Sequence, residues 1–265
     1  MNTFFNNIQI FSPLDQFEIR NLLSIDLPVL GNLQFSLTNI GLYLIIGTIF
    51  IILLGLLSTN YNRLEGNGWS FGFETLYHTV LSVVTNQING RSGQAYFPFI
   101  FALFIFILIN NLLGLIPYSF ASTSHFILTL SLSFTIVIGA TILGLSKHGL
   151  KFFSLFVPSG VPLALVPLLV LIEFISYSAR ALSLGLRLGS NIMSGHLLLS
   201  ILSGFTFQIM SVGVIFFILA LVPLAFIFLF SVMELVIAFI QSLVFIILTS
   251  SYLKDALDLH EDGSK

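Results

Sequence analysis

Four charged residues stand alone in the otherwise apolar stretch between residues 163 and 247: Glu173, Arg180, Arg187 and Glu234. A carboxylate can take up and release a proton, whereas an arginine keeps its charge because its pKa lies above about 12. Placing a guanidinium at the centre of a membrane costs between about 3 and about 10 kcal/mol or more, depending on the measure. Two arginines in such a stretch therefore indicate an ion path or an electrostatic gate.

Polar residues recur at steps of three and four through the first half of this stretch. They are Glu173, Ser176, Arg180, Ser183, Arg187, Ser190 and Ser194. This spacing places them on one face of an α-helix. At about 1.5 Å per residue the face is roughly 30 Å long, comparable with the hydrocarbon thickness of a bilayer. The serines alone are also explained by hydrogen bonds between membrane helices, but the arginines favour a polar track with a function.

The composition is that of an integral membrane protein. Of the 265 residues, 57% are hydrophobic and only 8% are charged, too few for a water-exposed globular surface. The net charge of −2 gives no support to nucleic-acid binding, and the lack of cysteine excludes disulfides and thiol chemistry. Neither a metal site nor a resident cofactor is indicated by the spacing of the histidines and carboxylates.

The expected fold is an all-α membrane protein with a surface segment over residues 1–36 and a single polytopic membrane domain over residues 37–265. Three spans are expected, at Leu37–Leu57, Phe97–Ile116 and Phe126–Leu145. Between the first two, residues 71–84 repeat apolar groups every three or four positions. This pattern fits either a helix that lies in the membrane interface or an ordinary amphipathic packing helix.

Two long apolar segments, residues 163–202 and 207–252, are each about twice the length of a perpendicular membrane span. Neither contains clear turn residues near its middle, although Pro223 could kink or interrupt the second. We therefore expect two long, steeply tilted helices that form a hairpin with Gly204 near its turn. Gly185 and Gly189 lie roughly opposite Arg187 around the first helix, and we expect them to form a close packing contact.

One stretch has part of the spacing of a phosphate-binding loop. Gly144 and Gly149 are separated as in that loop, but Leu150 stands where its lysine belongs. The sequence therefore predicts no nucleotide site on this chain, and nothing in it indicates an enzyme that acts alone.

The run Ser183–His196, SLGLRLGSNIMSGH, resembles the signature of subunit a of the rotary F-type ATP synthases. Further stretches of similarity are Ser12–Arg20, Leu112–Ala121, Phe153–Pro158 and Ser250–Ala256. Together they cover nearly the whole chain, most like the fungal mitochondrial form. The resemblance implies a multi-pass protein of the mitochondrial inner membrane, and a short leader, residues 1–11, that is removed before Ser12.

The resemblance also implies partners and a transported ion. The expected partners are a rotating ring of c subunits, the peripheral stalk, other membrane subunits and lipid. Each c subunit has one carboxylate at mid-membrane, and two offset half-channels carry protons to and from these groups. Arg187 matches the essential arginine of the family. His196 and Glu234 match the pair lining the half-channel on the intermembrane-space side, and Glu173 matches an acidic residue of the matrix-side half-channel.

The resemblance adds three further polar residues to the expected proton path. Asn191 and Gln241 match polar positions near the arginine, and Arg180 holds a supporting place whose role stays open. Gln241 shares a helical face with Glu234, and the small Ala238 between them leaves room for water.

Two other functions remain as alternatives. A standalone secondary transporter or ion channel would also place arginine and glutamate in broken membrane helices. Such proteins usually contain an internal repeat, and none is evident in this sequence. A purely structural subunit of a respiratory complex would instead tolerate neutral residues along the Arg187 face.

Overall fold

The computed structural model describes residues 12–27, 33–59, 66–88, 90–116, 119–157 and 165–257. Within these ranges the chain is mostly helical, and five helices are long and apolar enough to span a membrane. The expected all-α membrane fold is therefore confirmed. The implied leader, residues 1–11, lies outside the described residues.

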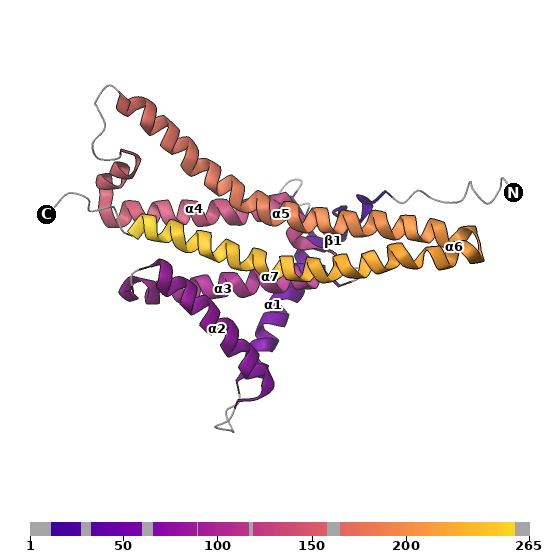
Figure 1. The fold of residues 1–265 in the computed structure, drawn as a ribbon. Coiled ribbons are helices and arrows are strands. Elements are labelled where there is room, and N and C mark those ends of the chain that lie inside the picture. The colour runs from indigo at the N-terminus through magenta and orange to yellow at the C-terminus, as the bar shows by residue number, and fades with distance from the viewer. Residues whose placement is uncertain are drawn as a thin grey trace.

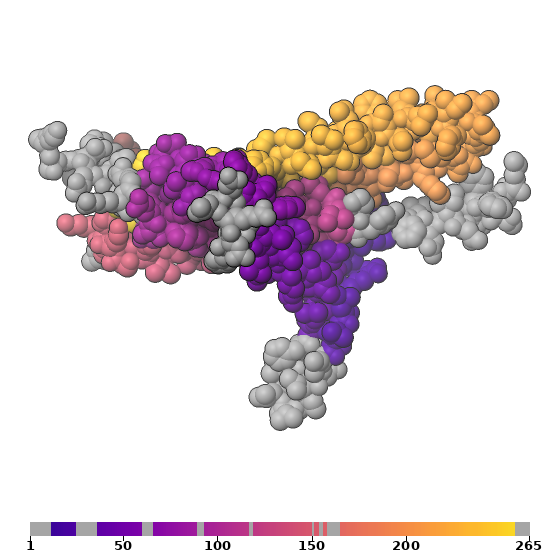
Figure 2. All heavy atoms as spheres, turned by 90° about the horizontal axis from the view of Figure 1, so that it is seen from below, coloured from indigo at the N-terminus to yellow at the C-terminus, as the bar shows by residue number. Residues whose placement is uncertain are grey.

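The described residues form seven α-helices. They are α1 (Asn39–Ser58), α2 (Gly68–Gln87), α3 (Gly90–Gly114), α4 (Phe126–His148), α5 (Val166–Val212), α6 (Val214–Leu219) and α7 (Leu221–Leu257). Helices α3, α4 and α7 lie side by side, α5 crosses α4, and α5 and α7 then continue together beyond the other two (Figure 1). Figure 2 shows this pair as an orange and yellow arm, with the indigo α1 projecting from the body.

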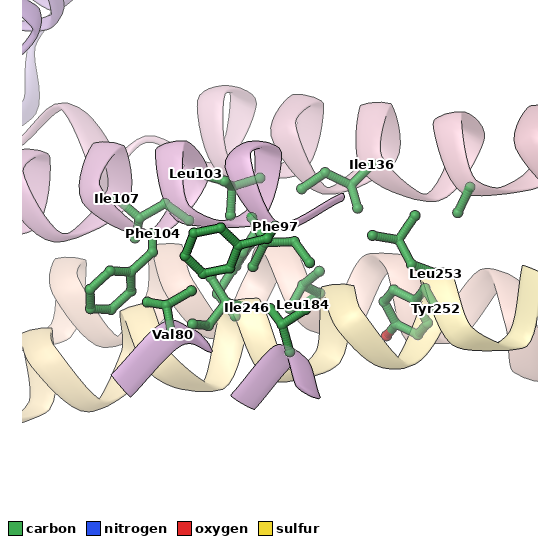
Figure 3. Packing of buried hydrophobic residues seen from close by; sticks show 14 of the residues in the cluster. Val80, Phe97, Leu103, Phe104, Ile107, Ile136, Leu184, Ile246, Tyr252 and Leu253 are labelled. Atoms are coloured by element: carbon green, nitrogen blue, oxygen red, sulfur yellow. The ribbon is translucent and has the colours of Figure 1, made fainter. Parts of the chain in front are cut away.

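One continuous cluster of buried apolar side chains joins α2, α3, α4, α5 and α7. Val80 of α2, Phe104 of α3, Leu184 of α5 and Ile246 of α7 lie together in it (Figure 3), each at most 2% exposed. Lipid tails are as apolar as these side chains, so burial alone gives little force between membrane helices. Close van der Waals packing and interhelical hydrogen bonds must hold them instead.

Small residues allow α5 to approach α4 closely. A Cβ at Gly185 would lie 2.9 Å from the Thr129 carbonyl oxygen, and one at Gly189 would lie 2.9 Å from Thr129 Oγ1. One turn earlier, the buried Ser133 hydroxyl donates a hydrogen bond to the Ala181 carbonyl oxygen. The packing role expected for the two glycines is confirmed.

The hairpin turn lies further along the chain than the sequence suggested. Helix α5 is 47 residues long and continues through Gly204, so the expected turn at Gly204 is wrong. The chain reverses instead around Gly213, α6 and Ala220. In lipid every backbone N–H and C=O needs an internal partner, which favours continuing a helix through a lone glycine. Pro223 lies in the first turn of α7, where its missing N–H costs no intrahelical bond.

The N-terminal segment contains two antiparallel strands that the all-α expectation missed. Strand β1 (Asn21–Leu27) pairs with β2 (Leu33–Thr38), with Ile25 opposite Phe35. A short 3₁₀ helix, η2 (Asp15–Phe17), precedes them. Because β2 extends to Thr38, the first span starts at Asn39 and not at Leu37.

Helix α2 packs along α3. Its Val80 and Val84 are at most 1% exposed. The ring centroids of Tyr77 and Phe97 are 4.8 Å apart, and those of Phe73 and Phe101 are 5.4 Å apart. These contacts support the packing interpretation of the segment, while its place relative to the membrane interface stays a prediction. Helix α3 already begins at Gly90 and contains Pro98, so it extends the expected second span at its N-terminal end.

We predict that Gly185→Ala weakens the α4–α5 contact. The added methyl group would press on the backbone of α4, and such overpacking typically costs about 1–3 kcal/mol of the free energy of unfolding. The measurement is the thermal unfolding midpoint of the full chain in detergent, followed by circular dichroism. Gly139→Ala in α4 is the control, because nothing lies within 4 Å of its added Cβ. Equal midpoints for the two variants would contradict the contact.

Candidate functional site

The polar face of α5 is open, and the opposite face is buried. Glu173 and Ser176 are half-buried, and the remaining five members, from Arg180 to Ser194, are exposed. The face that includes Leu184, Leu188 and Ile192 is at most 2% exposed and packs inside the molecule. The packing on α4 therefore fixes the rotation of α5 so that Arg187 lies on the open face, away from α4.

Arg187 lies in a polar groove between α5 and α7. The groove has a volume of about 480 Å³ and is lined by Ser176, Ala179, Arg180, Ser183, Arg187, Leu248, Ser251 and Tyr252. Within it, Arg187 Nη2 donates a hydrogen bond to Ser183 Oγ at 3.4 Å. No carboxylate of the described residues forms an ion pair with Arg187. Its charge is thus available to a group outside this chain.

Arg180 links the two long helices at one end of the groove. Its Nη2 lies 3.7 Å from Glu173 Oε1 on α5, and its Nη1 lies 3.7 Å from Asp255 Oδ2 on α7. Both carboxylates have side chains 37% exposed, so they remain accessible to solvent or to a passing group. Tyr252 strengthens the junction by donating a hydrogen bond from its hydroxyl to the Arg180 carbonyl oxygen at 3.4 Å.

Sequence reasoning did not single out Asp255. Asp255 is far from Arg180 in the chain, and no periodic pattern joins the two positions. The only available signal was the stretch Ser250–Ala256, which carries part of the family resemblance. Three acids that follow it in the chain, Asp258, Glu261 and Asp262, lie outside the described residues.

Glu234 lies on the inner side of α7, where it is only 6% exposed. Its carboxyl group lies against Gly195 of α5, so closely that a Cβ at position 195 would collide with it. Neither carboxyl oxygen has a hydrogen-bond partner among the described residues. Gly195 is a second residue that sequence reasoning missed, although it stands beside His196 in the signature run. Its small size is what admits the carboxyl group to this position.

His196 follows Gly195 and is half-buried next to α3. A Cβ at Gly114 would lie 3.8 Å from His196 Nε2, and this nitrogen has no hydrogen-bond partner among the described residues. The ring of Phe17 covers part of the imidazole edge-on, with centroids 6.4 Å apart. His196 thus lies beside α3, one residue after the Gly195 that contacts Glu234 of α7.

Asn191 and Gln241 are both half-buried. Their side chains make no hydrogen bond to another residue in the part of the chain that the structure describes. Ala238, between Glu234 and Gln241 on α7, is fully buried and packs with Ile192 of α5. The helices touch at Ala238, so the room expected there for water is filled by the helix contact.

The structure thus places titratable groups on both sides of a fixed cation. Along α5, Glu173 lies about 20 Å before Arg187 and His196 lies about 13 Å after it, at about 1.5 Å per residue. On the first side two part-exposed carboxylates lie beside Arg180 at one end of the groove, and on the second side lie the half-buried His196 and the buried Glu234. No group of three or more metal-binding side chains occurs among the described residues. The arrangement suits proton transfer toward and away from a charged barrier.

Known proteins match this chain over nearly its whole length. Residues 41–254 match the family described as ATP synthase A chain. Curated relatives named ATP synthase subunit a include that of Podospora anserina, 66% identical over 264 residues, which covers 98% of this chain and 100% of the relative. That of Neurospora crassa is 68% identical over 258 residues, covering 97% and 98%, respectively. That of Kluyveromyces lactis is 52% identical over 254 residues, covering 96% and 99%.

We predict that Gly195→Ala destabilises the chain because the new methyl group takes the space of the Glu234 carboxyl. The expected loss is about 1–3 kcal/mol in the free energy of unfolding, measured in detergent. Adding Glu234→Ala removes the colliding group and should recover most of this loss, so the two effects should not add. Gly204→Ala on the same helix has nothing within 4 Å of its new Cβ and reports the effect of alanine alone. Additive effects of the first two changes would count against the contact.

Proposed function

This chain belongs to the ATP synthase A chain family, the proton-translocating stator subunits of the F0 sector, and we propose that Arg187 divides its proton path into two halves. It is a membrane protein that works within a complex of other subunits. Family membership gives no support to a standalone transporter or to a purely structural subunit. The observation that carries the proposal is the open face of α5, where Arg187 has no carboxylate partner among the described residues.

The proposed partner of this face is a ring of c subunits, each with one mid-membrane carboxylate. A permanent cation favours the ionised form of a nearby carboxylic acid, so an acid that approaches Arg187 is driven to release its proton. The same cation repels a proton that would pass directly from one half-channel to the other. Each proton that crosses 100 mV supplies about 2.3 kcal/mol, so several must pass for each ATP made.

The groups on the two sides of Arg187 have separate parts in this proposal. Glu234 and His196 pass protons between the intermembrane space and the ring, and Glu173 does so on the matrix side. Asp255 joins Glu173 there, because both carboxylates pair with Arg180 at 3.7 Å. Arg180 then has a holding role, since it keeps the two acids at the groove mouth.

The remaining proposals concern two polar residues near Arg187 and the exposed apolar faces of the helices. Asn191 and Gln241 are proposed to line the path near Arg187 without carrying charge. The exposed apolar sides of α1 and of the α5–α7 arm suit lipid, the peripheral stalk and other membrane subunits. The fungal relatives support a place in the mitochondrial inner membrane. Residues 37–265 then form one membrane domain, and residues 1–36 lie at its surface.

Arg187→Lys should abolish most ATP synthesis although it keeps a positive charge. Lysine is more strongly hydrated, lacks the planar fork of arginine and can lose its proton when buried. Arg187→Ala should stop synthesis and open a proton leak, because water and apolar side chains alone then separate the half-channels. Both rates are measured in membrane vesicles under an imposed potential. Arg20→Lys, at an exposed surface pair with Glu18, is the control. Near-normal coupled synthesis by a fully assembled alanine variant would refute the proposal.

Glu234→Gln should leave the complex assembled but reduce proton-driven synthesis by a factor of about 100 or more, the usual contribution of a positioned acid–base group. Glutamine keeps nearly the same volume and removes the titratable group. ATP synthesis and the amount of complex are measured together. Glu74→Gln is a matched control, because Glu74 is an exposed residue of α2 that pairs with His78. A loss of synthesis that simply follows a loss of complex would make Glu234 structural.

A further inference from the structure

Helices α4 and α7 end at the same side of the molecule (Figure 1), and one hydrogen bond joins their last residues. His148 ends α4, and its Nε2 lies 3.0 Å from the carbonyl oxygen of Leu257, which ends α7. A carbonyl oxygen only accepts, so Nε2 carries the hydrogen and donates it. The last four carbonyl groups of a helix have no partner within that helix. The imidazole of α4 therefore caps the end of α7.

The chain that follows α4 packs around this contact. Gly149 ends the helix with a φ of +58°, which L side chains rarely adopt, and the short helix η4 (Gly149–Phe156) then folds back over α4. Its Phe152 is 4% exposed and lies on Gly144, where a Cβ would collide with the ring. The same Cβ would lie 3.4 Å from the Ala256 carbonyl oxygen, so α4 also touches the last turn of α7 directly.

Asp255 lies in the turn of α7 that His148 caps. It comes two residues before Leu257, and its Oδ2 lies 3.7 Å from Arg180 Nη1 on α5. The two side chains are 37% and 44% exposed, and an ion pair with this much exposure contributes little to stability. The pair with Arg180 is therefore too weak to fix the position of Asp255 by itself, and the contacts of α7 with α4 must do so.

The other acid that pairs with Arg180 is also supported from η4. The ring centroid of Phe156, near the end of η4, lies 6.4 Å from that of Phe174 and 6.0 Å from that of Tyr177. Phe174 directly follows Glu173 on α5. The end of α4 and η4 thus contact α7 beside one acid and α5 beside the other.

We propose that His148 is a positioning residue of the proton path, which holds the last turn of α7 so that Asp255 faces Arg180. The inference rests on the function proposed above for Asp255. Because His148 bonds the backbone of α7, it fixes the helix and with it the side chains of that turn. Without the bond the last turn can separate from α4, and Asp255 spends less of its time beside Arg180.

His148→Leu, which removes the donor and keeps a side chain of similar size, tests the proposal in the whole complex. ATP synthesis per assembled complex, in vesicles under an imposed potential, should fall roughly fivefold, the factor by which the loss of one such hydrogen bond shifts an equilibrium. His148→Gln returns an N–H donor on a side chain of similar reach and should restore most of the rate. His78→Leu is the matched control, because His78 is an exposed residue of α2 that pairs with Glu74, and its rate should be normal.

A distance measurement tests the position of α7 directly. The chain has no cysteine of its own, and the exposed Ser146 of α4 and Lys254 of α7 can carry spin labels after Ser146→Cys and Lys254→Cys. Double electron–electron resonance on the labelled full chain should give a narrow distance distribution, a broader one after His148→Leu and a narrow one again after His148→Gln. An unchanged distribution after His148→Leu would overturn the proposal.

The rates decide between positioning and simple stabilisation. A normal rate per complex in His148→Leu, or a loss that follows the amount of complex, would also overturn the role of His148. Asp255→Asn separates this failure from that of the proposed function. If Asp255→Asn synthesises ATP normally, the function proposed for Asp255 is wrong; if it is impaired while His148→Leu is normal, only the role of His148 is lost. In the double variant His148→Leu should lower the rate no further, and an additional fall would show that His148 acts elsewhere.

Discussion

A guanidinium that cannot give up its proton is the most costly group in this membrane fold. At mid-membrane such a charge costs about 3 kcal/mol on the lowest scale and several times more on others. In helix α5, Arg187 lies on one open face, while Gly185 and Gly189 on the opposite face pack against α4. The close α4–α5 contact fixes the rotation of α5, and with it the direction in which the charge points.

The two sides of this cation differ in how their acids are held. On one side Glu173 and Asp255 share Arg180 at the mouth of an open groove, where water can reach them. On the other side Glu234 is enclosed between helices and has no protein hydrogen-bond partner among the described residues. An enclosed acid depends on water that its neighbours hold in place, whereas an open one does not. The two halves of the proposed path therefore place different demands on the surrounding helices.

The helices and the polar face of α5 could be predicted because helical periodicity is a local property of the sequence. The packing role of Gly185 and Gly189 followed from the same periodicity, but most other contacts between helices could not be predicted. The turn at Gly213 could not be located from the sequence, because apolar residues occur both in a membrane helix and in a turn that faces lipid. Asp255 acquires its role only when α7 meets α5, and Gly195 only when Glu234 packs on it.

The open face of α5 also bears on how stable this subunit is before it joins its complex. Until another protein covers that face, Arg187 has no carboxylate partner among the described residues, and the arm of α5 and α7 extends beyond α3 and α4 (Figure 1). A partner that binds the folded chain stabilises it by mass action, so the newly inserted chain is at its least stable. Quality-control proteases would then remove surplus copies first. Degradation, as much as synthesis, would keep the number of these subunits equal to the number of motors.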